Sequence, residues 1–330
     1  MKTLLKIVTR VMEVMGRRWE ARLGTVHQAP GDIDEFLDMP FSGAGGAPLQ
    51  VDIFRPKGQT GPLPVAVVLH GGGLVVGTRK LSKRFSENLA MKGYLVFTPE
   101  YRLAKETDAI SEIGDVYESL SYVSEHLSEY GGDRNRVAVI SESAGSFLGV
   151  YAVASLNSQV LRDTFGFGTS DLKVSALVCF SGMFYTLRRD AIGIAYAPSI
   201  YGDRRKDPSF RQLMDPGCPE VMNNLPPVFL TSSDADFLKR YTTDYCAALR
   251  KAGHLCELLY YKDNKELTHA FPPLKTDLPE SREVMEKMVA WIGQIESRNQ
   301  LRFSSSTDSM KEFLGGGDIT QELSVEKNVN

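Results

Sequence analysis

Short apolar runs alternate with longer amphipathic stretches along most of this chain. Residues 65–69 form a continuous apolar run, which is typical of a strand buried on both faces. Largely apolar runs that also predict strands occur at residues 94–98, 137–140, 174–180, 227–231 and 255–261. Apolar positions with helical spacing predict helices over residues 81–92, 108–130, 147–155, 237–251 and 281–295. Residues 48–56 alternate apolar and polar side chains, as expected of a half-exposed antiparallel strand. Because predicted strands and helices alternate, the pattern indicates an α/β fold with a mostly parallel sheet covered by helices on both faces.

Three segments do not follow this alternation, namely residues 32–46, 182–226 and 298–330. Residues 32–46 are acidic and then rich in glycine, so we predict a linker there. Residues 182–226 contain many Pro, Asp and Gly residues and no strand pattern, which predicts a helical insertion between two strands. We therefore expect an N-terminal segment (1–46), a main domain (47–297) with an insertion at about 182–226, and a polar, flexible C-terminal tail (298–330).

The first residues of the chain form a pattern of their own. Residues 2–18 place apolar side chains at helical spacing, with lysines and arginines between them. A secretion signal would keep its basic residues ahead of an uninterrupted apolar run. We therefore predict an amphipathic helix that packs over the main domain as part of a cap, with peripheral attachment to an anionic membrane surface as the alternative. No segment approaches ~18 consecutive apolar residues, so no membrane-spanning helix is expected.

Composition narrows the classes of function. The chain has 330 residues and a formal net charge of −3, which argues against a nucleic-acid-binding protein. Its four cysteines lack the spacing of a metal site or of a disulfide framework, so neither is expected. Free thiols and the lack of a secretion signal predict a cytoplasmic location.

The stretch from residue 137 to residue 155 points to a reactive side chain. An apolar strand leads into small residues around Ser143, and an apolar helix follows. A strand, a sharp turn with serine at its tip and a helix form the geometry of a nucleophile elbow. The residues two positions away must be small. Gly145 meets this requirement, whereas Ser141 meets it only in part because glycine is expected there.

A serine nucleophile needs a base, which is usually histidine, and a carboxylate that orients the base. In the α/β-hydrolase arrangement the chain order is Ser, then Asp or Glu, then His. Of the five histidines, His269 follows the last predicted strand by a short loop and is the one that fits this order. The loop after residues 227–231 offers two carboxylates, Asp234 and Asp236. Position alone does not choose between them, and the other is expected to cap the next helix.

A glycine-rich loop supplies the third part of such a site. His70–Gly73 directly follows the strand at residues 65–69. Backbone N–H groups of such a loop, together with that of Ala144, would stabilise the negative charge that develops on an ester carbonyl oxygen. A dinucleotide-binding loop is the alternative, but the glycine spacing is one residue too long and Glu100 lies too far along the chain for the ribose-binding role.

Taken in order, these motifs carry a family resemblance. His70–Gly73 is followed by Tyr101–Ala104, Tyr130–Asp133, Ser143–Gly145, Asp236–Leu238 and His269–Phe271. The set resembles the α/β-hydrolase esterases and lipases of the hormone-sensitive-lipase-like group over roughly residues 52–295. The resemblance implies an eight-stranded, mostly parallel sheet with a small helical cap, and hydrolysis of short acyl esters without a cofactor. It implies Ser143 as nucleophile, Asp236 as orienting acid, His269 as base, and Gly72, Gly73 and Ala144 as oxyanion donors.

The chain departs from the family pattern at three positions. Ser141 and Ser146 stand where the elbow usually has glycine, and Leu74 stands where an aromatic residue often follows the glycines. The first departure predicts some distortion of the elbow, and the last predicts a differently shaped acyl pocket.

The sequence therefore predicts a serine carboxylic ester hydrolase acting on small-molecule esters. A non-catalytic ligand-binding protein of the same fold is an alternative. An amidase, peptidase or acyltransferase with the same triad is another, because pocket shape selects the leaving group and the acceptor. Tyr185, Tyr196, Tyr201 and Met214 of the insertion are candidates to line that pocket, although aromatic residues in an insertion more often serve ordinary packing. Activity is expected to fall as the pH drops through the titration of His269, and a flat rate between pH 5 and 8 would contradict this role.

Overall fold

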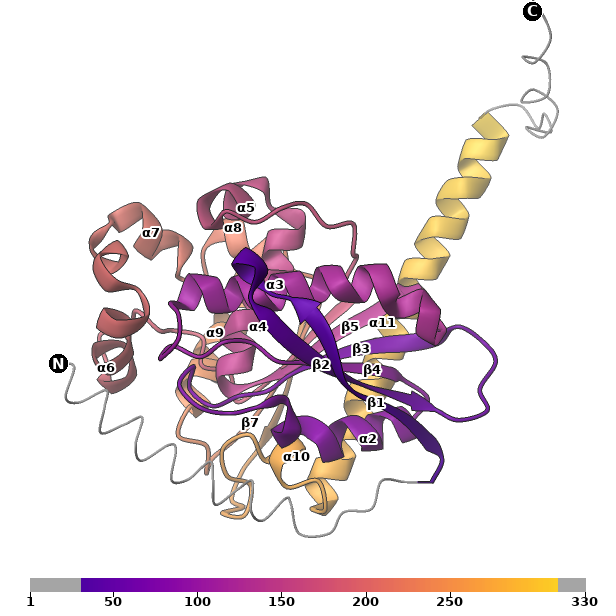
Figure 1. Cartoon of the computed structure of the whole chain (residues 1–330), viewed down its shortest axis with the longest axis horizontal. Coiled ribbons are helices and arrows are strands. Elements are labelled where there is room, and N and C mark those ends of the chain that lie inside the picture. Colours follow the sequence, from indigo (N-terminus) through magenta and orange to yellow (C-terminus); the bar gives the residue numbers. More distant parts are fainter. Residues whose placement is uncertain (1–30, 314–330) are drawn as a thin grey trace, which may run out of the picture.

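The computed structural model describes residues 31–313, with side chains described as far as residue 301. A single eight-stranded sheet has the order β1-β2-β4-β3-β5-β6-β7-β8 (Figure 1). The strands are β1 (Ile33–Ser42), β2 (Pro48–Pro56), β3 (Leu63–Leu69), β4 (Leu95–Pro99), β5 (Gly132–Glu142), β6 (Ala176–Phe180), β7 (Val228–Ser233) and β8 (Cys256–Tyr261). β2 pairs antiparallel with β1 and β4, and the other neighbours are parallel. The predicted mostly parallel sheet is confirmed.

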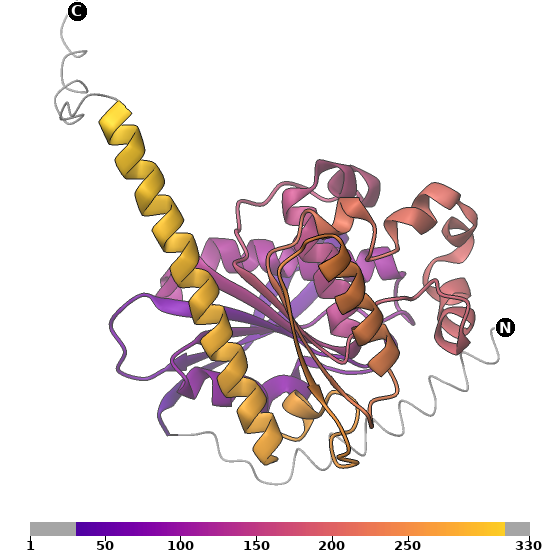
Figure 2. The same ribbon diagram turned by 180° about the vertical axis from the view of Figure 1, so that it is seen from behind.

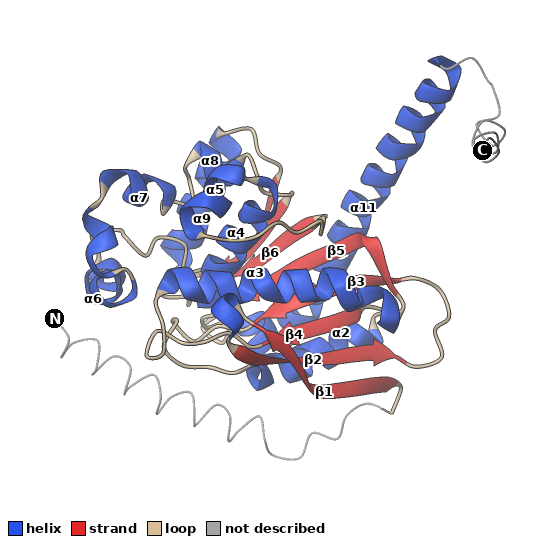
Figure 3. Ribbon diagram, turned by 45° about the horizontal axis from the view of Figure 1, so that its top comes forward, coloured by secondary structure: helices blue, strands red, loops and turns tan. Residues whose placement is uncertain are grey.

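Helices cover both faces of the sheet (Figure 3). One face packs against α3 (Ala109–His126), α4 (Ser143–Asn157), α5 (Gln159–Phe165) and α9 (Lys239–Lys251). The other packs against α2 (Lys83–Met91), α10 (Phe271–Leu274) and α11 (Pro279–Phe313), which crosses the back of the sheet in Figure 2. Strand β3 shows why its apolar run is continuous. Val65 and Val67 face the first layer, whereas Ala66 and Val68 face the second, and all four are buried.

The segment between β6 and β7 is helical, as the sequence predicts. It contains α6 (Ala191–Ile200), the short 3-10 helix η4 (Gly202–Lys206), α7 (Pro208–Leu213) and α8 (Pro219–Met222). In Figure 3 these helices gather at one side of the molecule. No helix in the described part of the chain is long and apolar enough to cross a membrane.

The prediction of a linker at residues 32–46 is wrong for most of that segment. Residues Ile33–Ser42 form the edge strand β1, which supplies the eighth strand, and Ala44–Gly46 form a 3-10 turn, η1. The pairing of β1 with β2 shifts register between Phe36 and Met39, and Asp38 there has a positive φ of 58°. Of the acidic residues that suggested a linker, Asp34 and Glu35 pair regularly with β2, and Asp38 lies in a β-bulge at the sheet edge.

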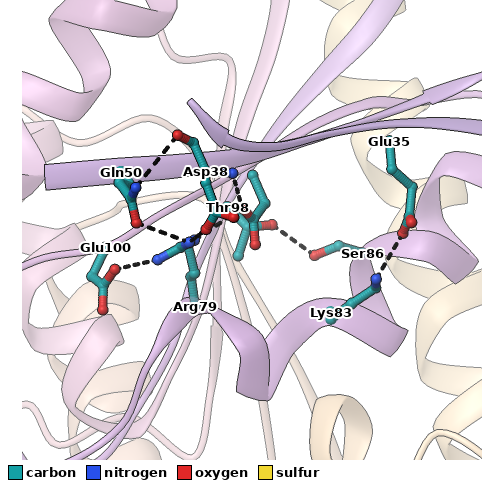
Figure 4. Close-up of polar contacts among 9 residues, drawn as sticks. Glu35, Asp38, Gln50, Arg79, Lys83, Ser86, Thr98 and Glu100 are labelled. Atoms are coloured by element: carbon teal, nitrogen blue, oxygen red, sulfur yellow. Dashed lines mark hydrogen bonds and ion pairs between the residues drawn. The ribbon is translucent and has the colours of Figure 1, made fainter. Parts of the chain in front are cut away.

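An ionic cluster includes Asp38 of strand β1 (Figure 4). Arg79, in the 3-10 helix η2 (Arg79–Ser82), lies buried among carboxylates. Its Nε lies 2.9 Å from Oδ1 of Asp52, and its terminal nitrogens pair with Asp38 and Glu100. The amide of Asp38 also donates to Asp52 Oδ1, at 2.8 Å. The cluster joins η2 to β1, to β2 and to the end of β4.

The C-terminal prediction is also partly wrong. The predicted flexible tail begins at residue 298, but helix α11 continues to Phe313. Its first turns bury an apolar stripe that includes Val284, Met288 and Ile292. Beyond Ile295 the apolar stripe ends, but the helix continues. This region contains Arg, Gln and Leu, which are strong helix formers. The helix there extends away from the sheet (Figure 2). The predicted helix at residues 2–18 and the rest of the predicted tail lie outside the described residues.

Candidate active site

The turn between β5 and α4 presents Ser143 in a strained backbone conformation. Its φ is 49°, and its carbonyl oxygen accepts a hydrogen bond from the amide of Met183 at 2.8 Å. At Gly145 an added Cβ would lie 2.6 Å from the carbonyl oxygen of Leu69 and even closer to that of His70, so a side chain does not fit. The backbone has the conformation expected of a nucleophile elbow.

Ser141 does not distort this turn. It is absent from the residues with positive φ, and its side chain is buried between strands. Its Oγ lies 2.8 Å from the carbonyl oxygen of Val178 and 3.1 Å from Oγ of Ser146. The two serines that replace the usual glycines therefore form a hydrogen bond with each other, and Ser141 forms another with strand β6. The predicted distortion of the elbow is not seen.

Three predicted residues lie in a continuous hydrogen-bonded row. Ser143 Oγ is 2.8 Å from Nε2 of His269, and Nδ1 of His269 is 2.7 Å from Oδ1 of Asp236. Asp236 Oδ2 also accepts from Ser232 Oγ at 2.6 Å, and Oδ1 accepts from the amide of Leu238 at 2.9 Å. Burial raises the pKa of Asp236, but the hydrogen bonds from His269 and Ser232 outweigh it and hold the pKa below its usual value. Asp236 therefore remains an ionised acceptor beside His269.

The structure distinguishes the two carboxylates that the sequence left open. Asp234 is exposed and accepts hydrogen bonds from the hydroxyl of Tyr260 at 2.8 Å and from the amide of Asp263 at 3.2 Å. It does not cap α9, whose N-cap position, Leu238, has no side-chain hydrogen bond, so that prediction is wrong. Of the two, Asp236 is the one that contacts His269.

The loop that carries His269 is fixed by the ends of two strands. Ser233, the last residue of β7, donates its hydroxyl proton to the carbonyl oxygen of Leu267. Ser181, directly after β6, accepts a hydrogen bond from the amide of Ala270 at 2.9 Å. These contacts flank the histidine on both sides and orient its ring toward Ser143.

The glycine-rich loop lies against Ser143. A Cβ added at Gly71 would lie 3.0 Å from Cβ of Ser143, and one at Gly72, which has a φ of 127°, would run into the carbonyl oxygen of Val76. Within the described chain, the amides of Gly72 and Gly73 donate no backbone hydrogen bond. The amide of Ala144 lies in the first turn of α4, where amides have no partner within the helix.

Glu142, which was not predicted from the sequence, connects this loop to the elbow. Its buried carboxylate accepts a hydrogen bond from the amide of Gly71, with a distance of 3.0 Å between N and Oε1. Burial raises the pKa of Glu142 to about 7, although the hydrogen bond from Gly71 and the nearby His269 both lower it. A carboxylate directly before Ser143 was visible in the sequence, but its partner is 71 residues away.

His70 supports the loop from below. Its ring stacks on Tyr101 with 4.2 Å between centroids, its Nδ1 donates to the carbonyl oxygen of Gly71 at 2.8 Å, and the hydroxyl of Tyr101 donates to the carbonyl oxygen of His70 at 2.7 Å. Burial lowers the pKa of His70 to about 4, so this histidine stays neutral.

Two other histidines make contacts elsewhere. His126 pairs with Glu129, and His254 contacts the carbonyl oxygen of Pro226.

The candidate pocket residues of the insertion are buried. Tyr196, Tyr201 and Met214 have less than a tenth of their surface exposed, and Tyr185 is half-buried. Tyr201 forms a hydrogen bond with Thr186 at 2.6 Å, and Tyr185 packs edge-on against Tyr241. Tyr201 therefore packs within the insertion, and Tyr185 packs against α9 of the main domain.

Comparison with known proteins places these motifs in a family. The BD-FAE family model matches residues 51–243. A probable isoprenylcysteine alpha-carbonyl methylesterase of Arabidopsis thaliana is 22% identical over 230 residues, which cover 64% of this chain and 47% of that protein. The chain spans about half the length of the curated relatives it matches.

Solved structures share the fold. Esterase B of Lactobacillus rhamnosis, in a structure with a tributyrin phosphonate inhibitor, superimposes with a TM-score of 0.83 over 92% of this chain and 98% of its own, at 20% identity. Brefeldin A esterase, described as a bacterial homologue of human hormone sensitive lipase, gives a TM-score of 0.66 over 89% and 86%, at 19% identity. These matches establish an α/β-hydrolase fold.

Proposed function

This chain belongs to the BD-FAE family and has the fold of the α/β-hydrolase esterases, and from that premise we propose that it hydrolyses carboxylic esters with Ser143 as the nucleophile. One observation carries the proposal. Ser143 Oγ, the ring of His269 and the carboxylate of Asp236 form a row in which the two joining distances are 2.8 and 2.7 Å. Such a row activates a serine hydroxyl.

In the first half of the reaction, Nε2 of His269 accepts the proton of Ser143 Oγ while that oxygen bonds to the ester carbonyl carbon. Asp236 holds Nδ1–H and stabilises the imidazolium that forms. The imidazolium then donates its proton to the alcohol oxygen as the ester C–O bond breaks, which leaves an acyl group on Ser143. In the second half, water takes the place of the alcohol. His269 accepts a proton from water, and Ser143 leaves with a proton when the acid is released.

The oxyanion of each tetrahedral intermediate would be held by the amides of Gly72, Gly73 and Ala144. Supporting this, the loop of Gly71–Gly73 lies against Ser143, and the Gly72 and Gly73 amides donate no backbone hydrogen bond within the described chain. Losing one such donor typically lowers the rate by a factor on the order of a hundred to a thousand. Glu142, through its contact with Gly71, would position this loop.

Small or short-chain acyl esters are the substrate class we propose. The inhibitor of the superimposable Lactobacillus esterase is a tributyrin phosphonate, which mimics a short-chain glyceride ester. In this proposal residues 182–226 form a cap over the site, and residues 47–297 make up the catalytic domain.

Hydrolysis of p-nitrophenyl acetate and butyrate by the wild type and by Ser143→Ala tests the proposal. We expect activity with both esters in the wild type and none above background in the variant. The corresponding p-nitroanilide of butyrate separates an esterase from an amidase, and added methanol reveals acyl transfer. A folded wild type that releases no nitrophenol would contradict the proposal and favour a ligand-binding protein.

A further inference from the structure

Phe237 is an exposed aromatic ring beside the proposed base. It follows Asp236 directly, and 72% of its surface is exposed, whereas Asp236 and Leu238 on either side are each 2% exposed. Of the residues that the structure describes, no other large apolar side chain is as exposed. The backbone thus turns the acid and Leu238 inward and the aromatic ring outward at the same point of the loop.

The ring contacts His269. The centroids of the two rings are 4.2 Å apart, and their planes are inclined by 36°. Most of the Phe237 surface still faces water, so this contact buries little of it. Core packing therefore does not account for an aromatic residue at this position, whereas a bound apolar group would remove its exposed face from water.

The chemistry of the site indicates which part of a substrate reaches this ring. The oxyanion side is occupied by the loop of Gly71–Gly73, which lies against Ser143. The leaving alcohol must lie next to Nε2 of His269, because that nitrogen returns the proton to the alcohol oxygen. Because the ring of Phe237 lies against the imidazole of His269, we place it on the alcohol side of the site.

We propose that Phe237 is a specificity-determining residue that selects esters of aromatic and other apolar alcohols. This inference rests on the proposed ester hydrolysis by Ser143 and names the alcohol portion of its substrate. The ring of Phe237 forms one wall of the alcohol site, and an aromatic alcohol packs on it while its oxygen stays beside His269.

The test compares two butyrate esters, benzyl butyrate and 2-methoxyethyl butyrate, whose alcohols are of similar acidity but differ in polarity. The kcat and KM values are measured for the wild type, Phe237→Ala and Phe237→Tyr. Leu255→Ala is the matched control. This apolar residue is 49% exposed and directly precedes β8, at the sheet edge opposite Ser143. All of these substitutions are at exposed positions, so unfolding midpoints are expected to stay close to that of the wild type.

We expect Phe237→Ala to lower kcat/KM for the benzyl ester by about tenfold, mainly through KM, and to change the 2-methoxyethyl ester by less than about twofold. Phe237→Tyr should keep the benzyl preference, and Leu255→Ala should match the wild type. An equal loss with both esters and a displaced pH profile would overturn the inference, because the ring would then act through His269. Unchanged selectivity in Phe237→Ala would also overturn it. A wild type that hydrolyses neither ester would instead refute the parent proposal.

Discussion

Replacing Gly145 by alanine tests whether the elbow depends on close contact between α4 and the loop after β3. The added Cβ would lie 2.6 Å from the carbonyl oxygen of Leu69 and closer still to that of His70. Ordinary contact between carbon and oxygen needs roughly 3.2 Å, so the overlap is on the order of half an ångström or more. Both opposing atoms belong to the backbone, so the start of α4 or the loop must move.

The expected loss follows from that displacement. Overpacking of this kind destabilises a protein by about 1–3 kcal/mol. Because the shift separates Ser143 from the loop of Gly71–Gly73, we expect kcat/KM to fall by roughly a hundredfold, the usual effect of a 1 Å misplacement.

Gly149→Ala is a matched control in the same helix. Its Cβ would lie 3.2 Å from Cδ1 of Leu69, which is the end of a flexible side chain. The higher helix propensity of alanine should offset this crowding, leaving stability within about 1 kcal/mol of the wild type. Urea unfolding and p-nitrophenyl butyrate kinetics measure both effects. A Gly145→Ala protein with wild-type activity would refute the proposed contact between elbow and loop.

Three further predictions concern the aspartates Asp234 and Asp236, the buried Glu142, and Ser141. Asp236→Asn should lower kcat by about 10⁴-fold, whereas Asp234→Asn should leave kcat within about twofold of the wild type. Equal losses of kcat in the two variants, measured by steady-state kinetics, would contradict the assignment of Asp236 as the carboxylate that orients His269. The folded-state pKa of Glu142 (about 7) lies above its ordinary value of 4.5, so the folded protein retains a proton that the unfolded chain has lost between these values. Urea unfolding at pH 5 and 8 should therefore show that the wild type loses stability relative to Glu142→Gln as pH rises, by about 3 kcal/mol at most. If the stability difference between the two proteins is the same at both pH values, this coupling is excluded. Ser141→Gly should reduce stability, because it removes the hydrogen bond to the carbonyl oxygen of Val178. We expect its kcat to stay close to that of the wild type. A marked rise in kcat would mean that Ser141 does distort the elbow.

Much of the fold could be predicted from the sequence because its central strands are buried on both faces. The apolar run at residues 65–69 is continuous for that reason, and it corresponds to β3. β1 could not be predicted in this way. Its acidic residues suggested a linker, but Asp38, although exposed, pairs with Arg79, which lies 41 positions further along the chain. Charge pairing across that distance leaves no local pattern in the sequence.

The candidate site was predictable to the extent that chain order constrains it. Ser143 and His269 follow from order and elimination, and the structure brings them to 2.8 Å. The choice between Asp234 and Asp236 depends on which side chain of one loop turns inward, which periodicity does not reveal. The contact of Glu142 with Gly71 and that of Phe237 with His269 depend in the same way on loops that meet only in the folded chain.

The central claim is that His269 activates Ser143 for attack, and its most direct test is covalent labelling of the folded protein. Wild type, Ser143→Ala and His269→Ala are incubated with a fluorophosphonate, and the adducts are located by peptide mass spectrometry. The wild type should gain one adduct, on the peptide that contains Ser143. Ser143→Ala should gain none there, and His269→Ala should react more slowly by a factor on the order of a thousand or more. An unlabelled wild type, or equal labelling rates in the wild type and His269→Ala, would contradict the account.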